Sequence, residues 1–252
     1  MHEKFQDLVD IIYRLRKECP WDREQTNDSI KAATIEEAYE VVQAIDDKDY
    51  TELKKELGDL LLHVVFHTVI AEESNHFTLP DVIDGITEKL IRRHPHIFSD
   101  TKVDNANDVK QNWEQIKLQE GRKSVIEGLP PHMPALMRAH RMQDKAAKVG
   151  FDWKEKADVW KKVEEELQEF KVAEAEGKQD AIEDEFGDLL FSLVNYARFV
   201  KVHPEDALRR TIAKFEQRFH YIEDRLEEQN KKITESTLEE MDFFWNQSKT
   251  AL

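Results

Sequence analysis

Ten carboxylates in this chain form two groups with the same internal spacing. Corresponding members are 129 positions apart, as 165 − 36 and 188 − 59 both give. On a helix, residues three and four apart share a face, so the first three acids of each group lie within an arc of roughly 100°. Like charges at this spacing repel one another, and a single such cluster is usually a solvated helix face. Its repetition favours a site instead. The groups are Glu36, Glu37, Glu40, Glu56, Asp59 and Glu165, Glu166, Glu169, Glu185, Asp188.

The chemistry that suits such a set is divalent metal binding. Carboxylate oxygens without cysteines or a regular histidine set favour hard cations such as Mg²⁺ or Mn²⁺. Two ions would balance the charge of four or five acids better than one. Mg²⁺ commonly binds phosphate oxygens as well, so the pattern predicts a phosphorylated substrate.

Two other interpretations explain only one copy. Thr34 and Glu37 have the spacing of a helix capping box, but Val163 stands at the position of Thr34 in the second copy (163 − 129 = 34). A di-iron site would require histidines at helical spacing, and His63 follows Asp59 by four residues. The second copy has Ser192 there, so His63 is interpreted as a local core or surface histidine.

Composition indicates an all-α protein with two domains. Charged residues make up 36% of the 252 residues, and the chain has only 7 glycines and 7 prolines, a balance typical of long helices. The 40% of hydrophobic residues suffice for a core. A proline- and glycine-containing stretch separates the copies, so we expect an N-terminal domain over 1–120, a linker over 121–134 and a C-terminal domain over 135–252.

Charge and targeting signals narrow the class of function. A net charge of −16 argues against nucleic acid or an anionic membrane as partner. The sequence lacks an apolar run of about 18 residues and a signal-peptide pattern at its start, so we expect a cytoplasmic protein. The single cysteine, Cys19, excludes an intramolecular disulfide and a cysteine-based zinc site.

Helical periodicity places both acid groups on helical hairpins. We expect a first helix that Pro20 ends, and further helices over about 30–44, 51–73, 79–93, 156–175, 181–200 and 204–228. Short turns join the two acid-bearing helices of each copy, 30–44 with 51–73 and 156–175 with 181–200, so the two parts of each acid group face each other. Gly58 and Gly187 fall inside helices, where glycine costs about 1 kcal/mol relative to alanine. They predict the close approach of a backbone or ligand, with close helix packing as the alternative.

Together with two further motifs, the repeated acids resemble the MazG nucleoside triphosphate pyrophosphohydrolases over essentially the whole chain. The motifs are Cys19-Pro20-Trp21-Asp22 and Arg93-His94-Pro95-His96-Ile97-Phe98. The resemblance implies two tandem helical-bundle MazG-like domains and a homodimer. It also implies Mg²⁺-dependent hydrolysis, with Mn²⁺ as a possible substitute, of NTPs and dNTPs to the monophosphate and pyrophosphate, with broad base tolerance.

The resemblance also assigns roles. In the second copy Glu166, Glu169, Glu185 and Asp188 would bind metal, with Glu165 beside them either as a group that supports the ligands or as the catalytic base that orients water. Lys162, Lys214, Arg218 and Trp245 would bind substrate. Glu37, Glu40, Glu56 and Asp59 would form a possible N-terminal metal site.

The copies differ at one predicted phosphate-binding position. Ala33 stands where the second copy has Lys162 (162 − 129 = 33), so we expect catalysis chiefly in the C-terminal domain and a mainly structural or dimer-forming first domain. The family often has a lysine just before the second half of the motif, and here that stretch is Ala181-Ile182-Glu183-Asp184, which bears on substrate preference.

Two alternatives to the broad hydrolase stay open. One is a non-catalytic, acidic, metal-binding helical interaction protein. The other is a narrow-specificity relative that acts on dUTP or a phosphoribosyl-nucleotide, although two motif copies in one chain favour the MazG arrangement.

Overall fold

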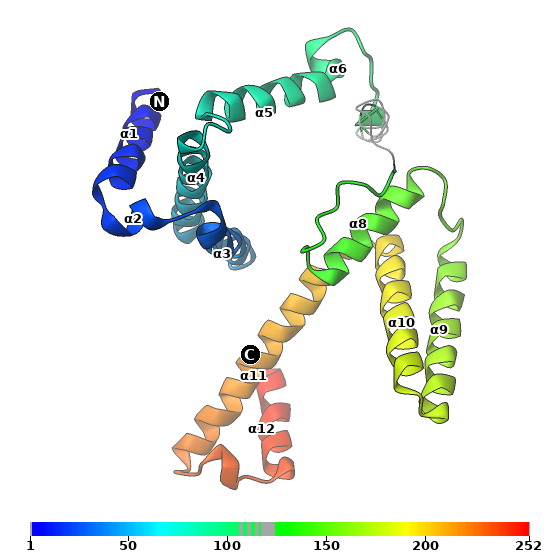
Figure 1. Cartoon of the computed structure of the whole chain (residues 1–252). Helices are drawn as coiled ribbons and strands as arrows, with labels where there is room; N and C mark the ends of the chain where they lie inside the picture. The colour runs from blue at the N-terminus through cyan, green and yellow to red at the C-terminus, as the bar shows by residue number, and fades with distance from the viewer. Residues whose placement is uncertain (1, 106–107, 110–111, 114–115, 117–123, 252) are drawn as a thin grey trace. The chain divides into compact units, whose positions relative to one another are not determined.

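The computed structural model describes residues 2–105, 108–109, 112–113, 116 and 124–251 (Figure 1). Helices are the regular elements of these residues, and no strand occurs among them, which confirms the all-α prediction. The elements are α1 (His2–Glu18), α2 (Pro20–Glu24), α3 (Asn27–Asp46), α4 (Tyr50–Glu73), α5 (Leu79–Arg93), α6 (Pro95–Phe98), α8 (Ala135–Ala147), α9 (Lys156–Glu176), α10 (Gln179–Phe199), α11 (Pro204–Glu228), the 3₁₀ turn η1 (Ile233–Glu235) and α12 (Leu238–Ala251).

The contacts within the chain divide it into two compact units, Met1–Trp113 and Glu114–Leu252. Part of the expected linker, residues 121–123, lies outside the described residues. The described remainder of that linker precedes α8, which begins at Ala135. The domain boundaries at residues 120 and 135 stay a prediction.

The predicted hairpins form in both units and begin in register. Helices α3 and α9 start 129 positions apart (156 − 27), and so do α4 and α10 (179 − 50). Asp49 caps α4, because its Oδ1 accepts the backbone N–H groups of Thr51 and Glu52 at 2.9 and 3.0 Å. Gly177 ends α9 with a φ of 74°, a left-handed conformation that glycine adopts without strain.

The start of α3 differs from the sequence-based expectation. Thr26 caps this helix through a reciprocal pair with Ser29, so the helix begins three residues earlier than 30. Thr34 consequently lies inside the helix, where its hydroxyl donates to the backbone oxygen of Ile30 at 3.1 Å. Thr34 is therefore not a helix cap in the first copy either.

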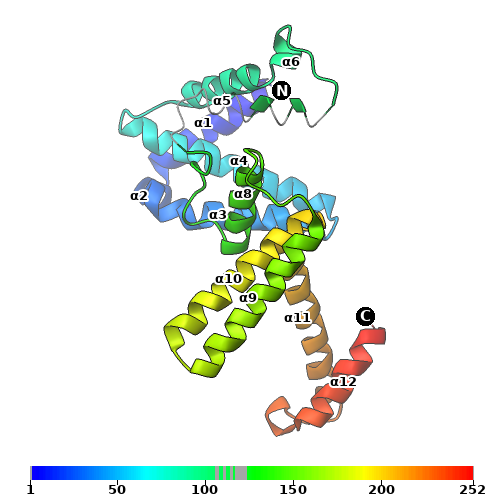
Figure 2. The same ribbon diagram turned by 90° about the vertical axis from the view of Figure 1, so that its right-hand side faces the viewer.

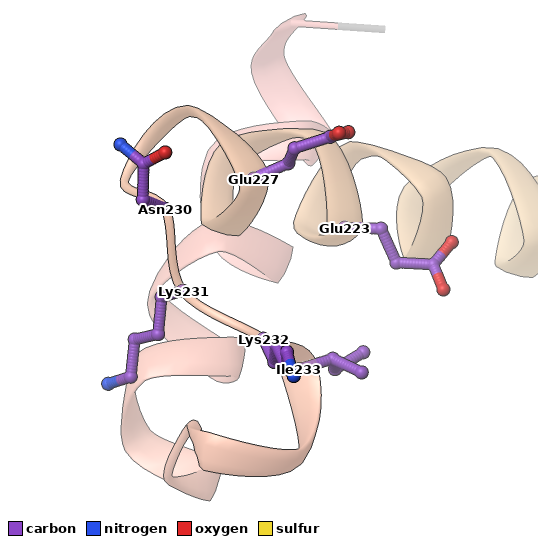
Figure 3. A pocket seen from close by; sticks show the side chains of 6 residues that line it. All are labelled: Glu223, Glu227, Asn230, Lys231, Lys232 and Ile233. Carbon is purple, nitrogen blue, oxygen red and sulfur yellow. The ribbon is translucent and has the colours of Figure 1, made fainter.

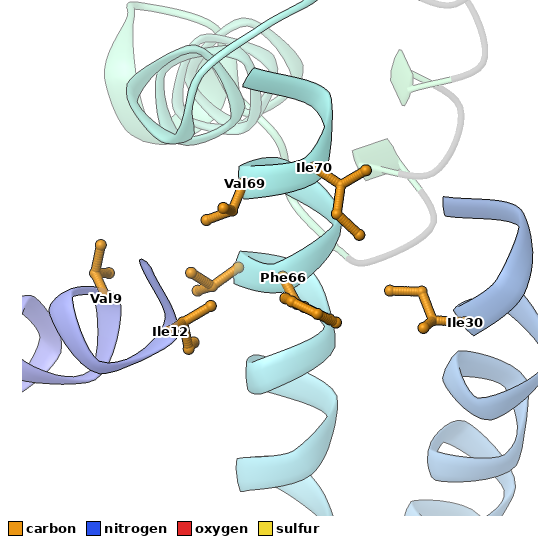
Figure 4. Packing of buried hydrophobic residues seen from close by; sticks show 7 residues of the cluster. Val9, Ile12, Ile30, Phe66, Val69 and Ile70 are labelled. Carbon is orange, nitrogen blue, oxygen red and sulfur yellow. The ribbon is translucent and has the colours of Figure 1, made fainter. Parts of the chain in front are cut away.

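The first unit has a well-packed core around α4. Figure 4 shows side chains of α4 between those of α1 and α3. Phe66 is 6% exposed and Ile12 is 1% exposed, so both contribute fully to this core. The buried cluster consists of Val9, Ile12, Ile30, Val65, Phe66, Val69 and Ile70.

The second unit is built from two hairpins that share α8. Helices α9 and α10 pack along each other, and α8 contacts both α10 and α11. The α11–α12 hairpin diverges from the α9–α10 hairpin in both views (Figures 1 and 2). It has its own buried cluster of Ile222, Leu226 and Phe244.

Gly58 of α4 and Gly187 of α10, the two glycines of the repeated motif, face open space. A Cβ atom added at Gly58 or Gly187 would meet no atom within 4 Å. Close helix packing within this chain therefore does not explain them, and any group that approaches them must come from outside the described chain. None of the described helices combines the length and apolar character that crossing a membrane requires.

Candidate functional site

Three acids of each copy meet across the predicted hairpin. In the first unit, Glu37 of α3 faces Glu56 and Asp59 of α4, and one carboxylate oxygen from each lies within 4.8 Å of the other two. This geometry results from the three-residue step between Glu56 and Asp59, which puts both on the face of α4 that packs on α3.

The second unit repeats this triad with Glu166 of α9 and with Glu185 and Asp188 of α10, again with the offered oxygens within 4.8 Å. Glu166 is 7% exposed, the most buried of the six. An oxygen-only donor set of this size fits a hard divalent cation such as Mg²⁺ or Mn²⁺. The structure thus brings together three of the four predicted metal ligands in each copy.

The fourth predicted ligand of each copy, Glu40 or Glu169, is exposed and adjoins its triad through another acid. Glu40 shares a hydrogen bond with Glu56, and Glu169 shares one with Glu166. These pairs place the fourth acids at the margin of the triads.

The electrostatics of both clusters favour a cation. Desolvation, followed by the charges of Glu40 and Asp59, raises the pKa of Glu37 above its ordinary value. Desolvation and the hydrogen bond with Glu40 raise the pKa of Glu56. In the second unit, desolvation and the hydrogen bond with Glu166 raise the pKa of Glu169. Desolvation and neighbouring acids thus disfavour the ionised form of these three carboxyls, and a bound cation would favour it.

Lys162 supplies the second unit with a cation that the first unit lacks. Its Nζ lies 2.7 Å from Oε1 of Glu165 and 2.7 Å from Oε1 of Glu166. These two hydrogen bonds raise the pKa of Lys162, so the lysine is charged at neutral pH. The predicted base and the predicted phosphate ligand thus lie together at the triad, whereas the first copy has Ala33 at this position.

The other predicted substrate ligands lie on the α11–α12 hairpin. The guanidinium carbon of Arg218 is 5.4 Å from the ring centroid of Trp245, and the Phe215 ring is 5.3 Å from it. Lys214 is exposed on the same helix as Arg218. Among the described residues, no hydrogen bond or ion pair joins Lys214, Arg218 or Trp245 to the carboxylates of the second triad. This chain therefore brings Arg218 and Trp245 together but does not bring them to the metal ligands.

His63 lies closer to the first triad than its interpretation as a local histidine suggested. Its Nε2 is 3.8 Å from Oε1 of Glu37, and its Nδ1 is 2.9 Å from the hydroxyl oxygen of Thr34. That hydroxyl is also 2.8 Å from Nε2 of His67, which in turn contacts Asn27 at 2.7 Å. The second copy has no such network at Ser192, whose hydroxyl donates to the backbone oxygen of Leu189 at 2.9 Å.

A cavity of about 590 Å³ adjoins the second triad. Lys162, Glu166 and Asp188 line it together with Ile126 and residues of α8, α10 and the loop before α9. Sequence reasoning missed these further residues, among them Gln143, Asp152 and Arg198. One feature of the sequence could have indicated these residues: the polar side chains Asn195 and Arg198 interrupt the apolar face of α10.

A second hollow, of about 460 Å³, lies where α11 joins α12. Its side chains point in different directions and do not converge on one point, as Figure 3 shows for Glu223, Glu227 and Lys231. This hollow does not include a residue of either triad and is not a candidate for the same chemistry.

Comparison with known proteins agrees with this site. The family model for the MazG nucleotide pyrophosphohydrolase domain matches twice, over residues 25–98 and 155–222. These segments contain all the carboxylates of both triads.

Similar proteins cover nearly the whole chain. The chain is 48% identical to the nucleoside triphosphate pyrophosphohydrolase/pyrophosphatase MazG of Thermotoga maritima, over 97% of this chain and 95% of that protein. It is 41% identical to the nucleoside triphosphate pyrophosphohydrolase of Escherichia coli K12, over 96% of this chain and 95% of that protein.

One solved structure, of a mazG-related protein from Thermotoga maritima, matches 45% of this chain and 98% of that chain, with 26% identity and a TM-score of 0.41. The two matches of the family model and the near full-length relatives show that the chain belongs to the MazG nucleotide pyrophosphohydrolase family.

Proposed function

We propose that this chain hydrolyses nucleoside triphosphates, both NTPs and dNTPs, to the monophosphate and pyrophosphate, chiefly through its second unit. The observation that carries the proposal is the triad of Glu166, Glu185 and Asp188 with the Lys162 ammonium 2.7 Å from Glu166. Two near full-length relatives bear the name of this activity. A cluster of acids beside a lysine suits a polyphosphate whose charge divalent ions neutralise.

The proposed cofactor is Mg²⁺, which Mn²⁺ can replace, held by Glu166, Glu185 and Asp188, with Glu169 as the fourth ligand. When bound, the ion supplies charge neutralisation at the phosphate oxygens and lowers the pKa of water. The same arrangement in the first unit would hold a metal with Glu37, Glu40, Glu56 and Asp59.

The protein groups account for the remaining steps. Glu165 accepts a proton from the attacking water, whose oxygen forms a bond to the α-phosphorus. The bond from the α-phosphorus to the oxygen that bridges to the β-phosphate breaks, and pyrophosphate leaves. Lys162 exchanges its contacts with Glu165 and Glu166 for phosphate oxygens, where an ammonium stabilises the charge of the leaving group.

The proposed assembly is a homodimer. Helices α10, α11 and α12 expose many large apolar side chains, and isolated water-facing apolar faces of this extent typically mark an interface. Gly187 faces open space on the same helix as Phe186 and Leu190. The exposed residues include Phe186, Leu190, Leu193, Leu208, Ile212, Phe215 and Leu238.

The dimer would also account for the position of Lys214, Arg218 and Trp245. These residues lie on a hairpin that packs against α8, not on the hairpin that carries the triad. We propose that these residues of one chain bind phosphate and nucleotide at the triad of Glu166, Glu185 and Asp188 in the partner chain of the dimer.

The product pair tests the proposed reaction. Each NTP and dNTP is incubated with the full chain and Mg²⁺, and the products are separated. Monophosphate with pyrophosphate supports attack at the α-phosphorus, whereas diphosphate with orthophosphate contradicts it. Metal binding without turnover would favour the non-catalytic interaction protein, and turnover of dUTP or a phosphoribosyl-nucleotide alone would favour the narrow relative.

Mixed dimers test whether the site is shared between two chains. Glu185→Gln and Lys214→Ala chains, each of low activity alone, are co-expressed with different tags and the mixed dimer is purified. If the site is shared, one of the two sites in the mixed dimer is intact, and about half of the native kcat returns. A mixed dimer as inactive as its parents would place both residues in one chain's site.

A further inference from the structure

The cavity beside the second triad is large enough for more than phosphate groups. Its volume of about 590 Å³ lies within the range of small-molecule sites, roughly 300 to 1,000 Å³. Besides the charged residues Lys162, Glu166, Asp188, Asp152 and Arg198, its walls are mostly apolar, aromatic and amide side chains from α8, α10, the segment before α8 and the loop before α9. These include Ile126, Met142, Gln143, Phe151, Trp153, Phe191 and Asn195.

Gln143 presents an unsatisfied acceptor among these residues. The side chain is 7% exposed, and its Nε2 donates to the backbone oxygen of Phe191 at 2.9 Å. Because a carbonyl oxygen only accepts, the amide nitrogen must face Phe191, and the amide orientation is fixed. The remaining atom, Oε1, is buried and has no hydrogen-bond partner among the described residues. An acceptor in this position is suited to a ligand that donates.

Aromatic side chains flank the cavity and are exposed in this structure. Phe151 is 83% exposed and Trp153 is 46% exposed, both in the loop before α9, and Phe191 of α10 is 44% exposed. Rings of this kind stack on flat heterocycles with little regard to their identity. A nucleobase fits such walls.

An ion pair holds the aromatic loop in place. Nη2 of Arg198 in α10 lies 2.8 Å from Oδ2 of Asp152, and the Arg198 side chain is only 12% exposed. Its Nη1 also donates to Asn195 at 2.6 Å. The loop is therefore anchored to the helix that carries Glu185 and Asp188, so the cavity and the triad keep a fixed relation.

The first copy differs from the second at two positions of this lining. Phe66 and Val69 occupy the positions of Asn195 and Arg198 (195 − 129 and 198 − 129), and both belong to its buried core. Side chains thus fill the corresponding place in the first unit.

On the basis of the proposed triphosphate hydrolysis, we propose that this cavity binds the nucleobase and that Gln143 Oε1 accepts a hydrogen bond from the base. All common bases carry an N–H donor on their pairing edge: the amino groups of adenine and cytosine and the ring N–H of guanine, uracil and thymine. A single acceptor selects for a donor without distinguishing these bases from one another. Gln143 would therefore give broad base tolerance and still disfavour a ring without a donor.

The test compares ATP with purine riboside triphosphate, which lacks the 6-amino group and has no donor on that edge. For the native chain with Mg²⁺, kcat/KM for the analogue should be about tenfold lower than for ATP, the value of one net hydrogen bond. In Gln143→Leu, kcat/KM for ATP should fall about tenfold and the preference should disappear. The ratio of the two substrates is insensitive to the fraction of folded enzyme. An unchanged ratio in Gln143→Leu would overturn the proposal.

Two tryptophans of similar exposure provide a matched pair. Trp153 lines the cavity and is 46% exposed, whereas Trp160 is 44% exposed and pairs with Glu164 and Tyr196 outside it. Trp153→Leu should raise KM for all NTPs about tenfold, and Trp160→Leu should leave KM within twofold. If Trp245→Leu raises KM strongly and Trp153→Leu leaves KM unchanged, the base binds at α12 and the proposal is wrong.

Binding separates this inference from the proposed reaction. The triphosphate α,β-methylene-ATP cannot be cleaved at the α–β bridge, and its dissociation constant is measured by calorimetry for the native chain and Gln143→Leu. A tenfold weaker binding to the variant supports the cavity even if ATP is not hydrolysed. If ATP is converted to monophosphate and pyrophosphate but the analogue binds the native chain and Gln143→Leu equally well, the base does not bind in this cavity, and the proposed reaction still holds.

Discussion

The two copies of the acid motif place the same three carboxylates on the same hairpin, but different surroundings adjoin them. In the first unit, Phe66 and Val69 of α4 pack into a buried core, and in the second, Asn195 and Arg198 of α10 line a cavity. The triad geometry is thus independent of whether a ligand-sized space lies beside it. A metal triad alone does not identify the catalytic copy, and the residues about two to three turns of helix away from it are more informative.

The electrostatic surroundings of the two triads differ as well. Lys162 makes two contacts with the acids of the second unit, and Ala33 makes none in the first. Desolvation and neighbouring acids raise the pKa of both Glu37 and Glu56, whereas His63 offers a weaker partner at 3.8 Å. The first triad therefore depends more on an added cation than the second.

The largest difference between the copies should appear when one metal ligand is removed from each. Glu185→Gln should lower kcat about a thousandfold, because the loss of one ligand charge removes about 4 kcal/mol of transition-state stabilisation. Glu56→Gln, the same change in the first unit, should lower kcat less than threefold. Steady-state rates of pyrophosphate release measure both. The assignment of catalysis to the second unit is wrong if Glu56→Gln abolishes turnover and Glu185→Gln does not.

Phe66 and Asn195 stand at corresponding positions, one in a buried core and the other at a cavity. Exchanging their residue types should show whether the two units differ in packing at this place. Phe66→Asn places a polar amide in the core of the first unit and should cost about 3 kcal/mol of unfolding free energy. In Asn195→Phe the new ring can occupy the cavity. The melting temperature of this variant should therefore change by only a few degrees, while its kcat/KM falls about tenfold. Urea unfolding and NTP turnover provide the two readouts. Equal destabilisation by the two variants would show that the second unit has a packed core at this place too.

The sequence was sufficient for the hairpins and for the acids that meet across them. Helical periodicity and the offset of 129 determine which faces of α3 and α4, or of α9 and α10, lie together. Side-chain spacing on adjacent helices is a local property, so Glu37, Glu56 and Asp59 could be grouped correctly without a structure.

Contacts between distant segments could not be predicted in this way. Gln143 on α8 reaches Phe191 on α10, and Asp152 in a loop reaches Arg198, over separations that no periodic pattern encodes. Likewise, four-residue spacing relates Lys214 to Arg218 but says nothing about whether α11 packs on α9 or on α8. His63 was set aside because the second copy has a serine there, a comparison that cannot detect features particular to one copy.

Exchanging the lysine tests how far it explains the functional difference. Lys162→Met should lower kcat/KM about thirtyfold, or about 2 kcal/mol, because a phosphate loses a charge-assisted hydrogen bond. Ala33→Lys in the Glu185→Gln background should restore no activity, because the first unit has the buried Phe66 and Val69 where Asn195 and Arg198 line the cavity of the second unit. Measurable NTP turnover by that double variant would show that the missing lysine alone silences the first copy.

The smallest expected effect is the pH dependence of metal stabilisation in the first unit. Glu37 and Glu56 have raised pKa values in the folded chain relative to the ordinary 4.5. For a raised carboxyl pKa, the contribution to stability is full below the unfolded value and is lost as the pH rises through the folded value. The metal-free protein should therefore lose stability as the pH rises from about 4.5, and saturating Mg²⁺ should offset that loss because it binds the ionised acids. We expect Mg²⁺ to raise the melting temperature a few degrees more at pH 8 than at pH 5.

Calorimetry of Glu185→Gln isolates the first triad, and Glu56→Gln in that background should remove most of the remaining difference between pH 8 and pH 5. Glu88→Gln, a change at an exposed glutamate of α5 outside both triads, is the matched control and should leave the difference intact. An equal Mg²⁺ effect at both pH values would mean that the first triad does not hold the ion. The first unit would then have only a structural role, and its repeated acids would not bind Mg²⁺.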